Sequence, residues 1–207
     1  IPITTASSNI CFKTQNGSVF HGEHELNKQL MSKNTIANLW LDPNVPATPQ
    51  AITALEQADY IIYSPGSLYG SIISNFLPLG VKKALATSKA QKILVTNLVS
   101  NRNQTHHFTP QKYLRVFRHY TGLKRPFDYL IMPKLTEAEF KKRFPGVAKA
   151  YALEHAHFLS WTPSEVAKVT SKGIKVITSD ILSITPQLNR LRHDPKKLAK
   201  LFRKLIK

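Results

Sequence analysis

The chain has 207 residues, of which 42% are hydrophobic and 20% charged, so it has the composition of a globular protein with one substantial core and not of a disordered chain. No apolar run reaches the roughly 18 residues needed to cross a bilayer, and the first residues lack the basic-then-apolar order of a signal peptide. Lys and Arg outnumber Asp and Glu by 29 to 12, and the resulting net charge of +17 favours anionic partners.

The first 42 residues predict a small antiparallel unit. Two strand-like runs, Cys11–Thr14 and Val19–His21, flank Asn16-Gly17, a dipeptide that favours a tight type I′ hairpin turn. A further strand is expected from Ile36 to Leu41. The N-terminal part is therefore expected to form a β-hairpin.

From Thr48 onward the pattern alternates between helix and strand. Thr48-Pro49 is a typical helix start, and apolar residues at helical spacing follow. Strands are expected at four apolar runs, Tyr60–Tyr63, Ile93–Thr96, Tyr129–Met132 and Ile174–Ile177. Helical stretches are expected between and after them, at 68–76, 81–86, 109–120, 133–156 and 195–205. Such alternation predicts an α/β fold, a Rossmann-like parallel sheet flanked by helices.

Two loops follow strands and are therefore placed where open α/β sheets bind ligands. The first runs from Ser64 to Ser71. Gly66 permits close backbone approach, and amides at the helix start with the hydroxyls of Ser67 and Ser71 would suit a phosphate, although a plain strand-to-helix turn needs the same residues. The second loop, 97–107, offers the amide of Asn97 and the hydroxyl of Thr105, or is simply a polar surface loop.

Other chemistries find less support in the sequence. Ser67 lacks the Gly-x-Ser-x-Gly order of a hydrolase nucleophile. The histidine pairs His106-His107, His155-x-His157 and His21-x-x-His24 match no zinc spacing with enough ligands, so we expect no metal site. The single cysteine, Cys11, excludes an internal disulfide and is typical of a reducing cytoplasm.

Several segments of the chain resemble one known protein family. The segment Ala58 to Ile72, which contains Pro65-Gly66-Ser67-Leu68-Tyr69, is similar to the strand and Gly-Pro-Gly-Ser-Leu-Tyr-Thr-Ser-Ile loop of the gluconeogenesis-factor family (YvcK type, UPF0052). Similarity continues through Lys149–Glu154 and through Leu191–Leu198, which contains the Arg-His-Asp-Pro ending. The family shares its superfamily with the phospholactate transferase CofD of deazaflavin-coenzyme synthesis.

The resemblance implies a CofD-like fold and a nucleotide-sugar site. It implies that this cytoplasmic protein binds a UDP-sugar and regulates carbon metabolism and cell shape, with no catalytic residue assigned. Carried over by position, Tyr151 and Arg192 are the expected UDP-sugar contacts, beside Gly66, Ser67, Leu68, Ser71, Asn97 and Thr105.

The resemblance begins in the middle of the family pattern. The Gly-Gly-Gly-Thr-Gly loop of the first β-α unit is not in residues 1–207, so we expect these residues to be the C-terminal portion of one CofD-like domain. The sheet would then be covered by the missing half or by a second copy, and this chain alone would bind UDP-sugar weakly.

Two alternatives stay open. One is a phospholactate-type transferase that uses Mg²⁺. The other is a basic protein that binds nucleic acid, which only the net charge supports.

Overall fold

The computed structural model of the chain describes residues 1–28, 34–100, 104–185 and 189–206. Its central feature is a four-stranded parallel sheet in the order β4-β5-β6-β7. These strands are β4 (Tyr60–Tyr63), β5 (Gln91–Val95), β6 (Tyr129–Pro133) and β7 (Lys175–Ser179). The expected α/β class is confirmed, and each of the four predicted strands is present within two residues of its expected bounds.

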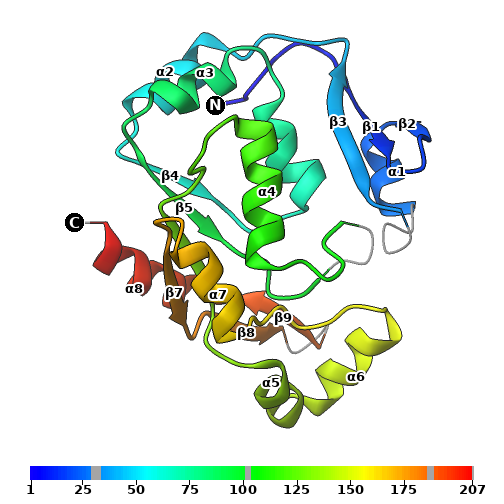
Figure 1. The fold of residues 1–207 in the computed structure, drawn as a ribbon, viewed down its shortest axis with the longest axis vertical. Helices are drawn as coiled ribbons and strands as arrows, with labels where there is room; N and C mark the ends of the chain where they lie inside the picture. The colour runs from blue at the N-terminus through cyan, green and yellow to red at the C-terminus, as the bar shows by residue number, and fades with distance from the viewer. Residues whose placement is uncertain (29–33, 101–103, 186–188, 207) are drawn as a thin grey trace.

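The two faces of this sheet carry separate hydrophobic clusters, because successive side chains of a strand point to opposite faces. Leu94 and Leu130 belong to one cluster, whereas Ile93, Val95 and Ile131 belong to the other. Both faces are therefore covered, as Figure 1 shows by the helices on either side of the sheet.

The first face is covered by helices that connect or follow the strands. They are α2 (Pro49–Gln57), α3 (Val81–Thr87), α4 (Pro110–Thr121) and α7 (Pro163–Thr170), with a short π-helical turn η1 (Leu68–Ile72) and a 3-10 turn η2 (Ile73–Phe76) after β4. The expected helix start at Thr48-Pro49 is confirmed, since the Thr48 hydroxyl accepts from the amide of Ala51, and the Thr109 hydroxyl caps α4 in the same way by accepting from the amide of Lys112.

The second face is covered by α5 (Glu137–Arg143), α6 (Pro145–Leu153), α8 (Pro195–Leu205) and an antiparallel pair, β8 (Leu182–Thr185) with β9 (Arg190–His193). Asp194 caps α8 by accepting from the amides of Lys196 and Lys197, and the helix begins at Pro195 as expected. The apolar stripe of α8 packs against this second cluster through Leu198, Leu201, Phe202 and Leu205.

The N-terminal residues form a second, antiparallel sheet in the order β2-β1-β3, joined to the body of the protein by core contacts of Phe12 and Leu39. Its strands are β1 (Asn9–Thr14), β2 (Val19–His21) and β3 (Ile36–Asp42), with helix α1 (Glu23–Lys28) between the last two. The predicted β-hairpin is confirmed, but its type I′ turn is wrong. Of the turn residues only Gly17 has a positive φ, of 94°, and the amide of Thr14 donates to the carbonyl of Ser18 across residues 15–17.

Several elements were not predicted. No sequence pattern predicted α1, α7, β8 or β9, and the expected helical stretch after β6 is divided at Phe144-Pro145 into α5 and α6. Proline at the first position of α6 has no amide to donate to the preceding turn, so one helix ends there and the next begins. No helix among the described residues is long and apolar enough to span a bilayer.

Candidate functional site

An open cavity of about 930 Å³ lies at the carboxyl ends of β4 and β5. Three segments form most of its lining. We call residues 65–71 and their partner Gln104 the loop wall, of which Pro65 and Gly66 line the cavity. We call residues 190–193 of β9 the hairpin wall. Residues 97–100 after β5 lie between these walls, and the end of α6 closes the remaining side through Tyr151, Leu153 and Glu154.

On the loop wall, the polar groups expected to bind phosphate are bonded within the protein. The Ser67 hydroxyl donates to Oε1 of Gln104 at 2.8 Å, and the amide of Tyr69 donates to the same oxygen at 2.9 Å. The amide of Gly70 donates to the Ser67 hydroxyl at 3.2 Å, and that of Ser71 to the Ser67 carbonyl at 2.9 Å. The start of η1 is thus capped by a buried glutamine side chain.

Asn97 joins the loop wall to the end of β5. Its side-chain amide donates to the Gly66 carbonyl at 2.9 Å, which fixes the position of the glycine beside the cavity. Next to it, the Ser100 hydroxyl lies 2.8 Å from Nδ1 of His157 and accepts from the His157 amide at 2.9 Å. Burial lowers the pKa of His157, and the neighbouring His107 lowers it further.

On the hairpin wall, two arginines two residues apart have different partners. Arg190 forms a two-point salt bridge with Glu154, directly after α6, with one N–O distance of 2.7 Å, and its guanidinium lies over the Tyr151 ring, 5.2 Å from the ring centroid. The hydrogen bond from Arg190 lowers the pKa of Glu154. Arg192 is exposed and donates from one nitrogen to the Leu191 carbonyl at 3.0 Å. Within the described ranges, no carboxylate forms a salt bridge with Arg192.

Tyr151 and His193 hold the hairpin wall against the rest of the protein. The Tyr151 hydroxyl accepts from the amide of Leu191 at 3.0 Å, and the side chain is only 7% exposed. Nε2 of His193 lies 3.0 Å from the Thr96 carbonyl at the end of β5. Burial lowers the pKa of His193, against the opposing effect of that hydrogen bond. A neutral His193 therefore donates to Thr96.

Of the eight residues expected at a site, the cavity brings together Gly66, Asn97, Tyr151 and Arg192. The other four do not line it. Leu68 is 1% exposed and lies in the hydrophobic core, Thr105 is buried, Ser67 bonds Gln104, and Ser71 borders a smaller apolar hollow along β4. A binding role for any of the eight stays a prediction.

The cavity also contains residues for which the sequence reasoning proposed no role. They are Ser100, Glu154, Arg190 and His193. His193 lies inside the Arg-His-Asp-Pro ending that pointed to Arg192, and Arg190 lies two residues before it, so alternation along one strand was the signal that could have found Arg190.

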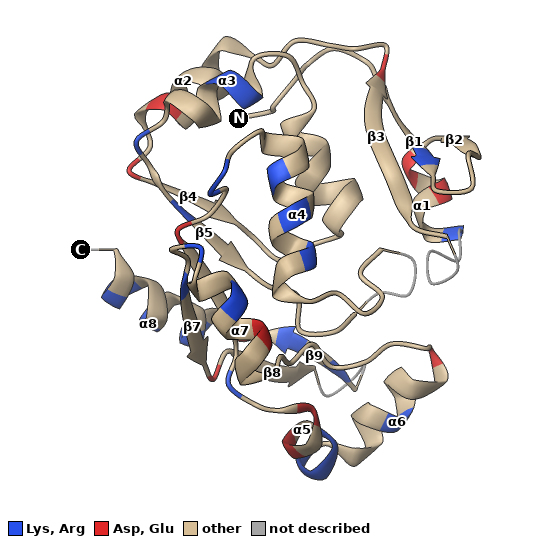
Figure 2. Cartoon of the chain, in the orientation of Figure 1, with Lys and Arg blue, Asp and Glu red and all other residues tan. Residues whose placement is uncertain are grey.

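Charge in the cavity favours an anion. Arg190 and Arg192 outnumber the one carboxylate, Glu154. Elsewhere, Lys and Arg are distributed over several helices, including α4, α5 and α8, and do not gather on one element (Figure 2). The cavity thus combines a permanent cation, Arg192, with a fixed glycine turn, an arrangement able to bind a phosphorylated ligand.

The chain is similar to known proteins of one family. A family model described as "2-phospho-L-lactate transferase CofD" matches residues 1–182. A putative gluconeogenesis factor of Thermoanaerobacterium thermosulfurigenes is 33% identical over 210 residues, a match that covers 100% of this chain and 60% of the relative. The gluconeogenesis factor of Bacillus subtilis is 24% identical, with 100% and 61% coverage.

Among solved structures, protein BH3568 of Bacillus halodurans, described as a member of the UPF0052 family, superimposes with a TM-score of 0.82 at 21% identity. The match covers 97% of this chain and 60% of that one, and it shows that the two share a fold. The chain therefore spans about 60% of the length of these two relatives and of this structure.

Proposed function

The chain belongs to the CofD family, and from that premise we propose that it binds a UDP-sugar in the cavity between the loop wall and the hairpin wall. The observation that carries the proposal is the position of Arg192, an exposed guanidinium that lines a cavity of about 930 Å³ and has no carboxylate partner among the described residues. A planar guanidinium pairs well with the oxygens of a diphosphate.

The remaining lining supports the same ligand. Gly66 presents a side-chain-free surface that the Asn97 amide holds in place, so a sugar or phosphate can approach the backbone. Glu154 balances Arg190 and leaves one net positive charge in the cavity. The choice of a UDP-sugar over other phosphorylated ligands rests on the family resemblance of residues 149–154 and 191–198.

In this proposal Tyr151 acts through the backbone. Its hydroxyl is bonded to the amide of Leu191, so the tyrosine positions the strand that carries Arg192, and its ring supports the guanidinium of Arg190. Tyr151 is therefore a positioning residue. We further propose that ligand binding serves regulation of carbon metabolism, as the names of the gluconeogenesis factors among its relatives suggest.

A partner is also part of the proposal. Strand β4 is an edge of the described parallel sheet, and Ile62 on it is 38% exposed beside an apolar hollow lined by Ile3, Leu55 and Leu85. A further β-strand, from another chain segment or from a second copy, would cover this edge.

Isothermal titration with UDP-glucose and UDP-N-acetylglucosamine tests the ligand. We expect saturable one-to-one binding that UDP weakens by competition and that ADP-glucose does not. Equal competition by every nucleotide diphosphate would show a general anion site and contradict the UDP-sugar assignment.

The transferase alternative corresponds to the description of the matching family model. It predicts Mg²⁺-dependent transfer of phospholactate to a deazaflavin acceptor, which product formation under multiple-turnover conditions would detect. The nucleic-acid alternative predicts DNA retention that survives physiological salt, whereas nonspecific charge predicts that retention is lost there.

A further inference from the structure

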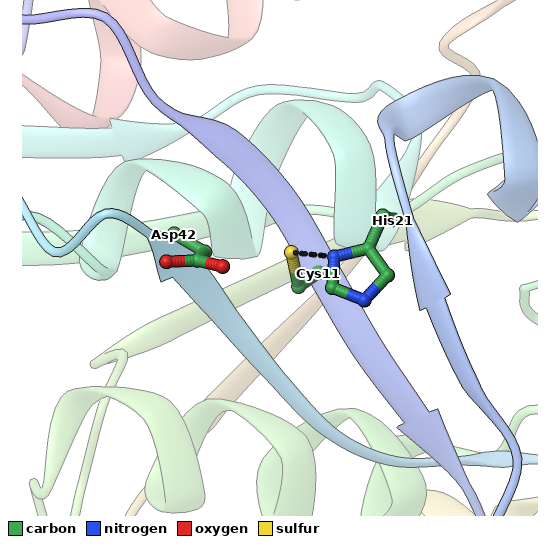
Figure 3. Close-up of side chains that lie close together, drawn as sticks. All are labelled: Cys11, His21 and Asp42. Atoms are coloured by element: carbon green, nitrogen blue, oxygen red, sulfur yellow. Dashed lines mark hydrogen bonds between the residues drawn. The ribbon is translucent and has the colours of Figure 1, made fainter.

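Three side chains with different donor atoms meet on the three-stranded sheet, away from the cavity (Figure 3). Cys11 lies on the central strand β1, directly opposite His21 on β2. Asp42 is the last residue of β3 and pairs with Asn9, whose side chain lies on the same sheet face as Cys11 because the two are two residues apart. The strand register thus brings the three side chains together.

The spacing of the donor atoms suits a metal ion. Sγ of Cys11 is 3.1 Å from Nδ1 of His21, and these two atoms and a carboxylate oxygen of Asp42 all lie within 4.8 Å of one another. Bond lengths of about 2.0–2.3 Å in a tetrahedral zinc site place its donors roughly 3.5 Å apart, so the 3.1 Å S–N separation is close to such a site and any wider separation has to shorten by side-chain rotation when the ion binds. Among the residues that the structure describes, this is the one group of three such side chains with this spacing.

The donor set selects the class of ion. A thiolate with an imidazole and a carboxylate suits Zn²⁺ and similar first-row ions, and not Ca²⁺ or Mg²⁺, which prefer oxygen ligands. Cys11 is fully buried, whereas His21 and Asp42 are exposed, so an ion could enter from the solvent side and keep a water as its fourth ligand.

A nucleophilic role for the thiol fits the geometry less well. In a Cys-His-Asp catalytic site the carboxylate orients the histidine, but here Cys11 lies between His21 and Asp42 (Figure 3). Burial raises the pKa of Cys11, and the Asp42 carboxylate raises it further, which opposes the formation of a free thiolate. A cation bound to the sulfur would favour the thiolate instead.

We propose that Cys11, His21 and Asp42 form a three-ligand site for Zn²⁺ or a similar divalent transition-metal ion, with a fourth position open to water. On binding, the ion forms a bond to the Cys11 sulfur and the thiol proton goes to solvent, while neutral His21 and the Asp42 carboxylate donate lone pairs. The ion would join all three strands of the small sheet, including the three-residue β2. This site goes against the sequence-based expectation of no metal site, which considered pairs of histidines and neither Cys11 nor Asp42.

Cobalt substitution tests the site. The full chain, freed of metal with a chelator, is titrated with Co²⁺ and then with Zn²⁺. We expect a sulfur-to-cobalt charge-transfer band and tetrahedral visible bands that saturate at one equivalent and disappear when Zn²⁺ is added. The absence of a sulfur-to-cobalt band at one equivalent would overturn the proposal.

Variants assign the ligands. Cys11→Ala, His21→Ala and Asp42→Asn should each lower Co²⁺ affinity by at least about tenfold, since even residues behind a metal ligand have effects of 10–100-fold. The matched controls are His24→Ala and Asp59→Asn, both at exposed positions outside the group, and they should bind Co²⁺ like the wild type. Retention of the band in Cys11→Ala, or equal losses in the controls, would contradict the assignment.

Thermal unfolding provides a second readout if Cys11→Ala does not fold. Zn²⁺ should raise the Tm of the wild type and of His24→Ala, because an ion that binds only the folded state stabilises it. Cys11→Ser, which keeps the size of the side chain, and the exposed-site variant His21→Ala should lose this shift. An undiminished Zn²⁺-induced shift in His21→Ala would show that the ion binds elsewhere.

Discussion

On the loop wall of the cavity, the hydroxyl of Ser67 and the amides of Tyr69 and Gly70 are bonded to groups of the protein, whereas Arg192 of the hairpin wall lines the cavity and has no carboxylate partner among the described residues. The loop has the more specific sequence motif, but the hairpin has the more available charge. The contrast shows that a motif can build the shape of a site while a less distinctive segment supplies its charge. The following predictions test whether the walls divide their roles in this way.

The largest expected effect is on ligand binding by the hairpin wall. Arg192→Ala removes the cation proposed to pair with the diphosphate, a charged hydrogen bond of about 1.5–3 kcal/mol, so the Kd for the UDP-sugar should rise roughly 10–100-fold. Stability should change little, since the side chain is exposed. Calorimetric titration measures the loss. The matched control is Arg203→Ala, at an exposed arginine on α8. An equal rise in Kd in this control would show that the loss comes from the general positive charge of the protein and not from Arg192.

The next effect is on stability, and it should come from the loop wall. Gln104→Ala leaves the buried amide of Tyr69 and the Ser67 hydroxyl without their acceptor, so the free energy of unfolding should fall by about 1–3 kcal/mol. Urea denaturation measures the change, with Gln57→Ala at the exposed end of α2 as control. If Gln104→Ala kept full stability but abolished UDP-sugar binding, the division of roles would be reversed.

A smaller effect is expected where the hairpin wall meets α6. Tyr151→Phe removes the hydroxyl that accepts from the Leu191 amide and keeps the ring under Arg190, so it should cost about 1 kcal/mol of stability. UDP-sugar affinity should fall only a few-fold, because Arg192 is retained. Chemical denaturation and calorimetry of the variant give both values, with Tyr129→Phe on β6 as control. A loss of affinity as large as that of Arg192→Ala would make the hydroxyl a direct ligand contact.

The smallest effect is a pH dependence from two histidines, His193 on the hairpin wall and His157, which contacts Ser100 between the walls. Folding lowers the pKa of His157 and of His193 below their ordinary value of 6.5, so at mildly acidic pH the unfolded chain binds protons that the folded chain does not. The free energy of unfolding should therefore be constant above about pH 7.5 and fall as the pH drops through about 6.5.

Urea denaturation at several pH values measures this slope. His157→Asn and His193→Asn should each reduce it, and the exposed His119→Asn should leave it unchanged. If the slope of either cavity-side variant equalled that of the wild type, that histidine would be excluded as its source.

Much of the parallel sheet was predictable, because buried strands such as Ile93–Thr96 are short apolar runs and because Thr48, Thr109 and Asp194 mark helix starts by their capping chemistry. The pair β8 and β9 was not, since residues 190–193 contain three basic residues and just one buried apolar residue, Leu191, so no apolar run marks the strand. Its pairing with β8 comes from contact with the second core cluster, which a local pattern does not encode.

The sequence analysis expected Gly66, Asn97, Tyr151 and Arg192 at one site, and all four line the same cavity. Gly66 and Asn97 are neighbours because each follows the carboxyl end of a strand in the parallel sheet. The hydrogen-bond partner of Ser67 was not predictable, because Gln104 lies 37 residues away along the chain. Whether the Ser67 hydroxyl bonds a ligand or the Gln104 side chain depends on tertiary packing. The cluster of Cys11, His21 and Asp42 was missed for the same reason, since strand register and not sequence spacing brings its members together.

The most direct test of the central claim is a map of UDP-N-acetylglucosamine on the chain by amide chemical-shift perturbation in two-dimensional NMR. The account predicts that the largest shifts come from residues 190–193 and 97–100, with much smaller ones at the amides of Tyr69 and Gly70, and that Arg192→Ala abolishes the pattern at the same ligand concentration. Shifts that are largest at Tyr69 and Gly70 and persist in Arg192→Ala would contradict it.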